Sequence, residues 1–425
     1  NRWGFFPSGS IGWNMAKEKW MSGAHFLDDL KLRASVGLLG NDYVSEYMFL
    51  STYSQWEDKV IYSSGSNNAY YSTAVPSPDL TWEKTLSYNV GMDVSMWRGK
   101  LTAELDVFYN YTYDMLTAQS SGFPSSMGGY YPDWINYNEI DARGVDFSIT
   151  HKNSVMVAGR PFYYQIGASV TYSKTRWLKY KDDPNAPEIQ KIVGTPVGSF
   201  LAWTADGLYR SEEEIDNSAW FGTRPCVGDI KYRDLNGDGK IDSQDKGLVG
   251  RPNRPQLTYG LNLAISWCGI DLNAQFTGGA LFDVSLTGTY YNGYDDNTVW
   301  TQTFKEGANS PRYLVQNAYS EYNKNGTMPR LTLSNTGHGG DNGLASTFWL
   351  RNGRYIRLKS AQLGYTFPKK WMEKIGIESI RLFAEGQNLF TIDGLPEGID
   401  PESPGVNNGY YPQQRLLMGG LTLTF

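Results

Sequence analysis

The sequence contains very little cysteine and histidine. Its 425 residues include two cysteines, Cys226 and Cys268, and three histidines, and none of these five residues is near another in the chain. This scarcity excludes zinc fingers, iron–sulfur clusters and a disulfide framework. We expect both cysteines to be free thiols, because Cys226 falls in a long predicted connection and Cys268 in a short turn at the opposite end of the predicted strands.

Long hydrophobic runs and an excess of positive charge are missing as well. No stretch approaches the roughly 18 apolar residues of a membrane helix. Lysine and arginine number 38 against 44 acidic residues, which gives a formal net charge of −6. Because no basic run is present that would track a phosphate backbone, nucleic acid is not an expected partner.

What the sequence has instead is a regular alternation of apolar and polar residues. Every second residue is apolar between Thr85 and Met96, and again between Leu101 and Tyr113. This two-residue period predicts a long β-hairpin, because successive side chains of a strand point to opposite faces. The pattern recurs near residues 30–38, 145–149, 164–172, 257–265, 270–276 and 417–425, and more weakly at 5–15 and 380–390.

One further alternating stretch, residues 355–367, is irregular. Its apolar phase slips near Lys359 and Ser360, which predicts a bulge or a strand that starts late. With this stretch included, the sequence predicts an all-β protein of about eleven strands.

The predicted connections alternate between short and long. The short ones lie near residues 19–28, 97–100, 152–160, 267–269 and 368–376, and the long ones near 40–83, 116–135, 178–255, 278–352 and 391–411. An antiparallel transmembrane β-barrel has this arrangement, with tight periplasmic turns and large extracellular loops. We therefore expect the apolar face to meet lipid, and the polar face to line a lumen with residues such as Asp93, Glu104, Asp106, Asp146 and Gln275.

Several motifs carry a resemblance to a known family. They are STFWLRNGRYIRLK at 346–359, LGYTFP at 363–368, GQNLF at 386–390 and IDPE at 399–402, together with GVD at 144–146 and GRP at 250–252. Their residues and order resemble SusC/RagA-type TonB-dependent transporters, over nearly the whole chain. The resemblance implies a barrel of about 22 strands with an N-terminal plug in the Gram-negative outer membrane.

The same resemblance implies function and partners. Such a transporter imports oligosaccharides or peptides under a SusD-type lipoprotein lid, with energy relayed through TonB. Residues 1–425 would be the C-terminal part of the barrel, with extracellular loops and a periplasmic C-terminus. Since single-chain bacterial barrels have even strand numbers, an odd count predicts a companion N-terminal chain that supplies the plug and the remaining strands.

One predicted loop has the pattern of a calcium site. Residues 234–245 read DLNGDGKIDSQD, with oxygen donors at the spacing of a calcium loop and a glycine for its sharp turn. The expected ligands are Asp234, Asn236, Asp238, the carbonyl of Lys240, Asp242 and Asp245, and the expected role is structural. The alternative is a solvated acidic turn.

Aromatic clusters in the long loops suggest a substrate site. The candidates are Tyr130, Tyr131, Trp134, Tyr290, Tyr291 and Tyr294. Their rings would stack on sugars beside carboxylates that accept hydroxyl hydrogen bonds. The alternatives are loop packing and a partner interface, where tyrosine and tryptophan are also common.

Catalysis finds little support. Glu104 and Asp106 share a polar face and resemble a glycosidase pair, but lumen lining explains them better. We expect a protein that is not an enzyme. A transporter is the leading interpretation. The second is a secreted calcium-dependent carbohydrate-binding β-sandwich, and the third is a surface glycoside hydrolase.

Overall fold

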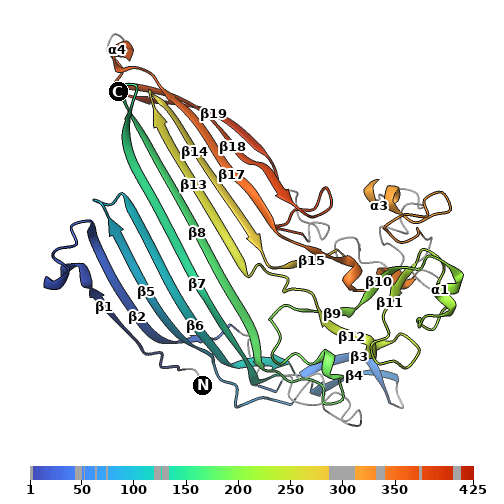
Figure 1. The fold of residues 1–425 in the computed structure, drawn as a ribbon. Helices are drawn as coiled ribbons and strands as arrows, with labels where there is room; N and C mark the ends of the chain where they lie inside the picture. Colours follow the sequence, from blue (N-terminus) through green and yellow to red (C-terminus); the bar gives the residue numbers. More distant parts are fainter. Residues whose placement is uncertain are drawn as a thin grey trace.

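The computed structural model consists of one large β-sheet and a group of shorter elements at one end of its strands (Figure 1). Eleven strands pair antiparallel, each with the next of them along the chain, which confirms the predicted fold class and strand count. They are β1 (Ser8–Asn14), β2 (Leu27–Asn41), β5 (Glu83–Met96), β6 (Leu101–Ala118), β7 (Trp134–Val157), β8 (Arg160–Lys179), β13 (Leu257–Trp267), β14 (Ile270–Ala280), β17 (Tyr355–Thr366), β18 (Ser379–Asp393) and β19 (Leu416–Thr424).

The remaining elements are short. The other strands are β3 (Tyr53–Tyr62), β4 (Gly65–Ser72), β9 (Phe200–Trp203), β10 (Ala205–Leu208), β11 (Ile230–Tyr232), β12 (Lys246–Val249), β15 (Asp283–Ser285) and β16 (Leu350–Asn352). The α-helices are α1 (Glu212–Asp216), α3 (Arg312–Asn317) and α4 (Lys369–Met372), and 3-10 turns cover Met15–Lys17, Lys19–Met21, Glu188–Gln190, Ser243–Asp245, Gly340–Gly343 and Thr347–Trp349. No described helix is long and apolar enough to cross a membrane.

The structure describes most of the chain. The described residues are 3–43, 50, 51, 53–62, 65–72, 75–118, 126, 134–286, 312–331, 340–372, 376–404 and 413–425.

The apolar face of the large sheet is exposed. Val90 is 60% accessible, Leu363 is 55% and Val107 is 49%, and all three belong to the alternating apolar positions. The buried hydrophobic side chains of the described residues all lie outside the eleven strands. A sandwich packs this face into a core, so the β-sandwich interpretation is wrong.

Two hairpins of the sheet close with two-residue turns. β7 and β8 meet at Ala158 and Gly159, and β13 and β14 meet at Cys268 and Gly269; all four residues have positive φ. Positive φ at both central residues defines a type I′ turn, which matches the twist of the flanking strands. The first turn is much shorter than the predicted segment 152–160, because the two strands stay paired up to it.

The predicted irregularity in β17 is confirmed. The pairing of β17 with β18 shifts between Leu358 and Ser360, so that Lys359 has no register partner there. A bulge of this kind restores the alternation beyond it. Residues on both sides of the bulge therefore keep their polar side chains on the same face of the sheet.

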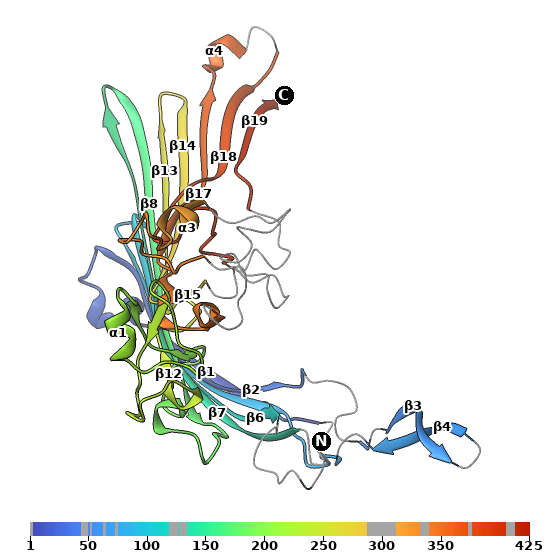
Figure 2. The same ribbon diagram turned by 90° about the vertical axis from the view of Figure 1, so that its right-hand side faces the viewer.

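The two ends of the strands differ, and Figure 2 shows the sheet as a single curved layer. The C-terminus and α4 lie at the end with the tight turns, whereas β9 to β12 lie at the opposite end (Figure 1). β1 and β19 form the two edges, and neither pairs with a further strand in the part of the chain that the structure describes.

Candidate functional site

Two of the long connections, β8–β13 and β14–β17, pack together at one end of the sheet into a compact body with a hydrophobic core. We call this body the loop assembly; it comprises residues 180–256, 281–286, 312–331 and 340–354. Its buried core consists of Leu208, Ile230, Tyr232, Ile241, Phe282, Val284, Leu286, Met328 and Trp349. These residues come from the β8–β13 and β14–β17 connections, and Leu395 and Ile399 of the β18–β19 connection pack against them.

A buried carboxylate joins the two main connections of the loop assembly. Asp229 accepts hydrogen bonds from Arg330 Nε at 2.6 Å and from Asn342 Nδ2 at 2.9 Å. Asn342 in turn accepts from the backbone N–H of Ile230 at 2.7 Å, and its carbonyl accepts from Trp349 Nε1 at 2.8 Å. Because buried polar groups are costly unless they are paired, this network fixes the two connections against each other.

A second polar cluster attaches the last long connection to the sheet. Arg357 on β17 is buried and donates to Asp400 at 2.7 Å, to Glu402 at 2.7 Å and to Thr391 at 2.8 Å. It also donates to Gln413. The motifs NGRYIRLK and IDPE, which are far apart in the sequence, therefore meet through one guanidinium.

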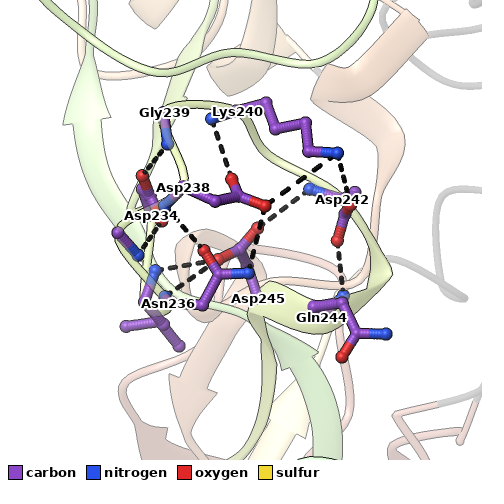
Figure 3. A network of polar contacts seen from close by, with 10 residues as sticks. Asp234, Asn236, Asp238, Gly239, Lys240, Asp242, Gln244 and Asp245 are labelled. Atoms are coloured by element: carbon purple, nitrogen blue, oxygen red, sulfur yellow. Dashed lines mark hydrogen bonds and ion pairs between the residues drawn. The ribbon is translucent and has the colours of Figure 1, made fainter.

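The predicted calcium loop lies within the loop assembly (Figure 3). Asp234 accepts from the backbone N–H groups of Gly237 at 2.6 Å and Gly239 at 2.8 Å. Asp245 is fully buried and accepts from Leu235 at 2.8 Å and from Asp242 at 2.9 Å. These bonds hold the turn closed at both of its ends.

The remaining predicted ligands form short turns of their own. Asn236 accepts from the N–H of Asp238 at 3.0 Å, Asp238 from that of Lys240 at 3.1 Å, and Asp242 from that of Gln244 at 2.7 Å. The structure thus brings the predicted ligands into one turn. Among the described residues, however, no three acidic, histidine or cysteine side chains converge on one point as metal ligands.

The charge balance of this turn fits a cation. Four carboxylates share it with a single ammonium group, that of Lys240, which lies 3.7 Å from Asp242 and 3.9 Å from Asp238. The backbone N–H of Gly239, followed by other amides of the turn, holds the pKa of Asp234 below its ordinary value. A set of ionised oxygen donors is the chemistry that Ca²⁺ requires.

The packing behind the turn anchors it in the loop assembly. Ile241 is buried in the core and donates its N–H to the carbonyl of Trp220 at 3.1 Å. Trp203 Nε1 donates to the carbonyl of Asp242 at 2.9 Å. A change in the turn is therefore transmitted directly to core residues.

The polar face of the sheet carries ion pairs that cross a strand. Arg33 on β2 donates to Asp93 Oδ1 at 2.7 Å and reaches Asp106 Oδ2 on β6 at 3.0 Å. Gly91 lies in register between Arg33 and Asp106, where a Cβ would come within 2.4 Å of Asp106. The absent side chain therefore makes room for the bridge.

The same arrangement occurs in the other half of the sheet. Arg381 Nε lies 3.0 Å from Asp271 Oδ1 across β17, where Gly364 is the register partner of Asp271 and Thr366 is that of Arg381. A Cβ at Gly364 would approach both side chains within 2.6 Å. Neither bridge is predictable from the sequence pattern, because the members of each lie in different strands far apart in the chain.

A polar hollow of about 440 Å³ lies on this face. Its lining includes Gln165, Asn262, Asn273, Gln275, Gln362 and Glu385. Gln362 Nε2 donates to Glu385 at 2.9 Å, so part of the lining is already held in place. Amides and carboxylates of this kind present both donors and acceptors to a polar ligand.

Of the six residues of the predicted aromatic substrate site, one lies among the described residues. Trp134 begins β7 and is 38% accessible, while Tyr130 and Tyr131 lie outside the described residues. Tyr290, Tyr291 and Tyr294 lie outside them as well. Cys226 and Cys268, the two cysteines, are both unpaired thiols.

Comparisons with known proteins agree with this architecture. A family model described as TonB dependent receptor-like, beta-barrel, matches residues 1–389. TonB-dependent receptor P3 of Formosa agariphila is 27% identical, with 100% of this chain and 42% of that protein covered. TonB-dependent receptor SusC of Bacteroides thetaiotaomicron is 26% identical, with 100% of this chain and 40% of that protein covered.

Solved structures show the same fold. The structure of the RagAB peptide transporter matches with a TM-score of 0.70 at 22% identity and covers 99% of this chain and 43% of that one. The RagAB peptide importer in its open-open state matches with a TM-score of 0.74 at 21% identity, over 100% of this chain and 43% of that one. The chain thus spans less than half the length of these relatives.

Proposed function

The chain belongs to the TonB-dependent receptor-like β-barrel family, and from that membership we propose that it forms part of the wall of an outer-membrane importer. The observation that carries this proposal is the exposed apolar face of the eleven-stranded sheet, combined with hydrophobic burial confined to the loop assembly. Exposed apolar surface on this scale is costly in water and favourable in lipid. The loop assembly, in contrast, is built like a water-soluble domain.

The cargo in this proposal is an oligosaccharide or a peptide. The amide-lined hollow and the ion pairs Arg33–Asp106 and Arg381–Asp271 give the polar face many fixed donors and acceptors. Sugar hydroxyls and peptide groups both need such partners. Trp134, together with Tyr130, Tyr131, Tyr290, Tyr291 and Tyr294, remains our candidate set for contacts at the loop end.

The importer needs parts that lie beyond these residues. Unpaired strand edges are not tolerated in lipid, so β1 and β19 require further strands, from a companion chain or from adjoining sequence. In our proposal that part also carries the plug and the segment that contacts TonB. A SusD-type lipoprotein would cover the loop assembly, consistent with the resemblance of the motifs to SusC/RagA-type transporters.

Fractionation and uptake test this function. We expect the chain in the outer membrane, extractable only with detergent, and heat-modifiable on a gel because a β-barrel resists unfolding. We also expect uptake of one labelled oligosaccharide or peptide class that stops when TonB is deleted. A chain recovered in the soluble fraction would refute the barrel, and uptake that persists without TonB would refute the energy source.

We also propose that residues 234–245 bind a structural Ca²⁺ through Asp234, Asn236, Asp238, the Lys240 carbonyl, Asp242 and Asp245. The proposal is supported by the sequence spacing and by the excess of carboxylates over ammonium groups in the turn. Calcium would balance this charge and stiffen the turn, whose Ile241 belongs to the buried core. Elemental analysis of the purified protein before and after chelation tests whether calcium is bound.

A further inference from the structure

Two cations lie directly opposite each other on the exposed apolar face of the sheet. Arg143 of β7 and Lys174 of β8 are register partners, and both side chains are exposed. They continue a row of cross-strand neighbours in which Tyr88 pairs with Tyr109, and Tyr109 pairs with Arg143. The row therefore changes from tyrosine to two adjacent positive charges.

This pairing is unfavourable as it stands. Like charges directly opposite each other in antiparallel strands repel, since their Cβ atoms are only about 5 Å apart. Among the residues that the structure describes, neither Arg143 nor Lys174 has a hydrogen-bond or ion-pair partner. The nearby acid on this face, Asp141, is fully buried and already accepts from Arg176 Nε at 2.9 Å.

The position of the pair along the strands places it near the loop end. Arg143 is the register partner of Tyr109 on β6, and Lys174 is the next residue after Tyr172 on the same face of β8; both tyrosines are exposed. The lipid-facing apolar band of a barrel is about 25 Å tall. The pair therefore lies level with exposed tyrosines on the loop side of the apolar face, where the aromatic girdle of a barrel meets the headgroups.

We propose that Arg143 and Lys174 together bind the phosphate group of an anionic lipid in the outer leaflet. A guanidinium binds a phosphate through two parallel hydrogen bonds, and an adjacent ammonium adds a point charge. This inference rests on the proposed membrane orientation of the apolar face.

A lipid fits this surface better than a free phosphate ion. Val145, Phe147 and Val170 continue the same face toward the tight turns, and each is more than a third exposed. Acyl chains would cover these side chains while the headgroup meets the two cations. A free phosphate ion would gain nothing from the apolar surface below the pair.

The test uses the intact transporter, purified in detergent and placed in phosphatidylcholine nanodiscs with a minority of diphosphoryl lipid A. Bound lipid A is measured by native mass spectrometry for the wild type and for R143Q/K174Q. The matched control is R98Q/K100Q, which removes the same two charges from the exposed turn at the other end of the strands. A swapped variant, R143K/K174R, keeps both charges.

We expect the wild type, the control and the swapped variant to retain lipid A, and R143Q/K174Q to lose it while remaining heat-modifiable. Equal retention by all variants would overturn the proposal, and so would inorganic phosphate that displaces lipid A at comparable concentration. Heat-modifiability and detergent extraction report on the barrel itself. Failure of the lipid site is thereby distinguished from failure of the proposed function.

Discussion

Arg33 and Asp106 form an ion pair across an intervening strand, with Nη2 and Oδ2 3.0 Å apart. The strand between them contributes Gly91, whose missing side chain leaves the space through which the two groups meet. Arg381 and Asp271 also meet across an intervening strand, where Arg381 reaches diagonally past Gly364, the register partner of Asp271. The polar face thus uses glycine to let oppositely charged residues meet over the strand between them.

The first prediction concerns this space. Gly91→Ala should displace Arg33 or Asp106 and destabilise the sheet by about 1–3 kcal/mol, the usual cost of overpacking. Gly9→Ala is the matched control, because a Cβ there meets nothing within 4 Å. The temperature at which the heat-modifiable band disappears measures the effect. Equal temperatures for the two variants would show that the bridge tolerates the methyl group.

The second prediction concerns the attachment of the last long connection. Arg357→Ala leaves Asp400 and Glu402 without their buried partner, so we expect a loss of about 3–5 kcal/mol. The measurement is the rate of limited proteolysis between β18 and β19. Lys359→Ala is the control, because Lys359 is partly exposed and, among the described residues, its ammonium forms an ion pair with Glu402 alone, at 3.1 Å; its cost should stay below about 1 kcal/mol. Similar rates for both variants would contradict the assigned role.

The third prediction separates a calcium site from a hydrogen-bonded turn. Asp238→Asn keeps an oxygen that accepts from the N–H of Lys240 but removes the negative charge. If the turn binds calcium, the variant should need more calcium for the same protection of residues 225–250 against protease. Asp206→Asn, outside the turn, should not change this requirement. Protection that is independent of calcium in the wild type would refute the site.

The fourth prediction concerns pH. The backbone N–H of Arg210 and the ammonium of Lys231 hold the pKa of Glu214 below its ordinary value of 4.5. A carboxyl group with a lowered folded pKa stabilises the protein above its ordinary pKa, and the contribution disappears as pH falls through the folded value. The loop assembly should therefore lose thermal stability as pH falls below about 4.5.

Tryptophan fluorescence during heating at a series of pH values checks this fourth prediction. Glu214→Gln should lower the stability at pH 7 and flatten the pH dependence. Glu213→Gln, a change at the exposed neighbouring residue, should leave the pH profile as it is in the wild type. A wild-type profile that is flat below pH 4.5 would show that Glu214 contributes little.

The predictable part of the structure is the part with a short repeat or a local motif. Alternation over two residues revealed the strands of the sheet, and even the bulge near Lys359 left a visible slip in phase. The turn at 234–245 is also local, since the hydrogen bonds within it join residues no more than ten positions apart. The alternation and the loop motif can both be recognised in the sequence, because each depends on residues that are close together in the chain.

The contacts between the connections of the loop assembly leave no such signal. Asp229 meets Arg330 and Asn342 across more than a hundred residues, and no periodic pattern connects them. The motifs around Arg357 and Asp400 are recognisable by resemblance, but the contact between them is not. Packing between irregular segments depends on where the sheet places their ends, which composition and spacing do not encode.

The confinement of the hydrophobic core to the loop assembly has a consequence for the order of folding. Its members come from two connections, with side chains of a third packed against them, and these segments meet only once the strands between them stand side by side. Before that, closing such long loops costs entropy without any contact in return. The large sheet should therefore form first, and the loop assembly should fold after the strands have inserted into the membrane.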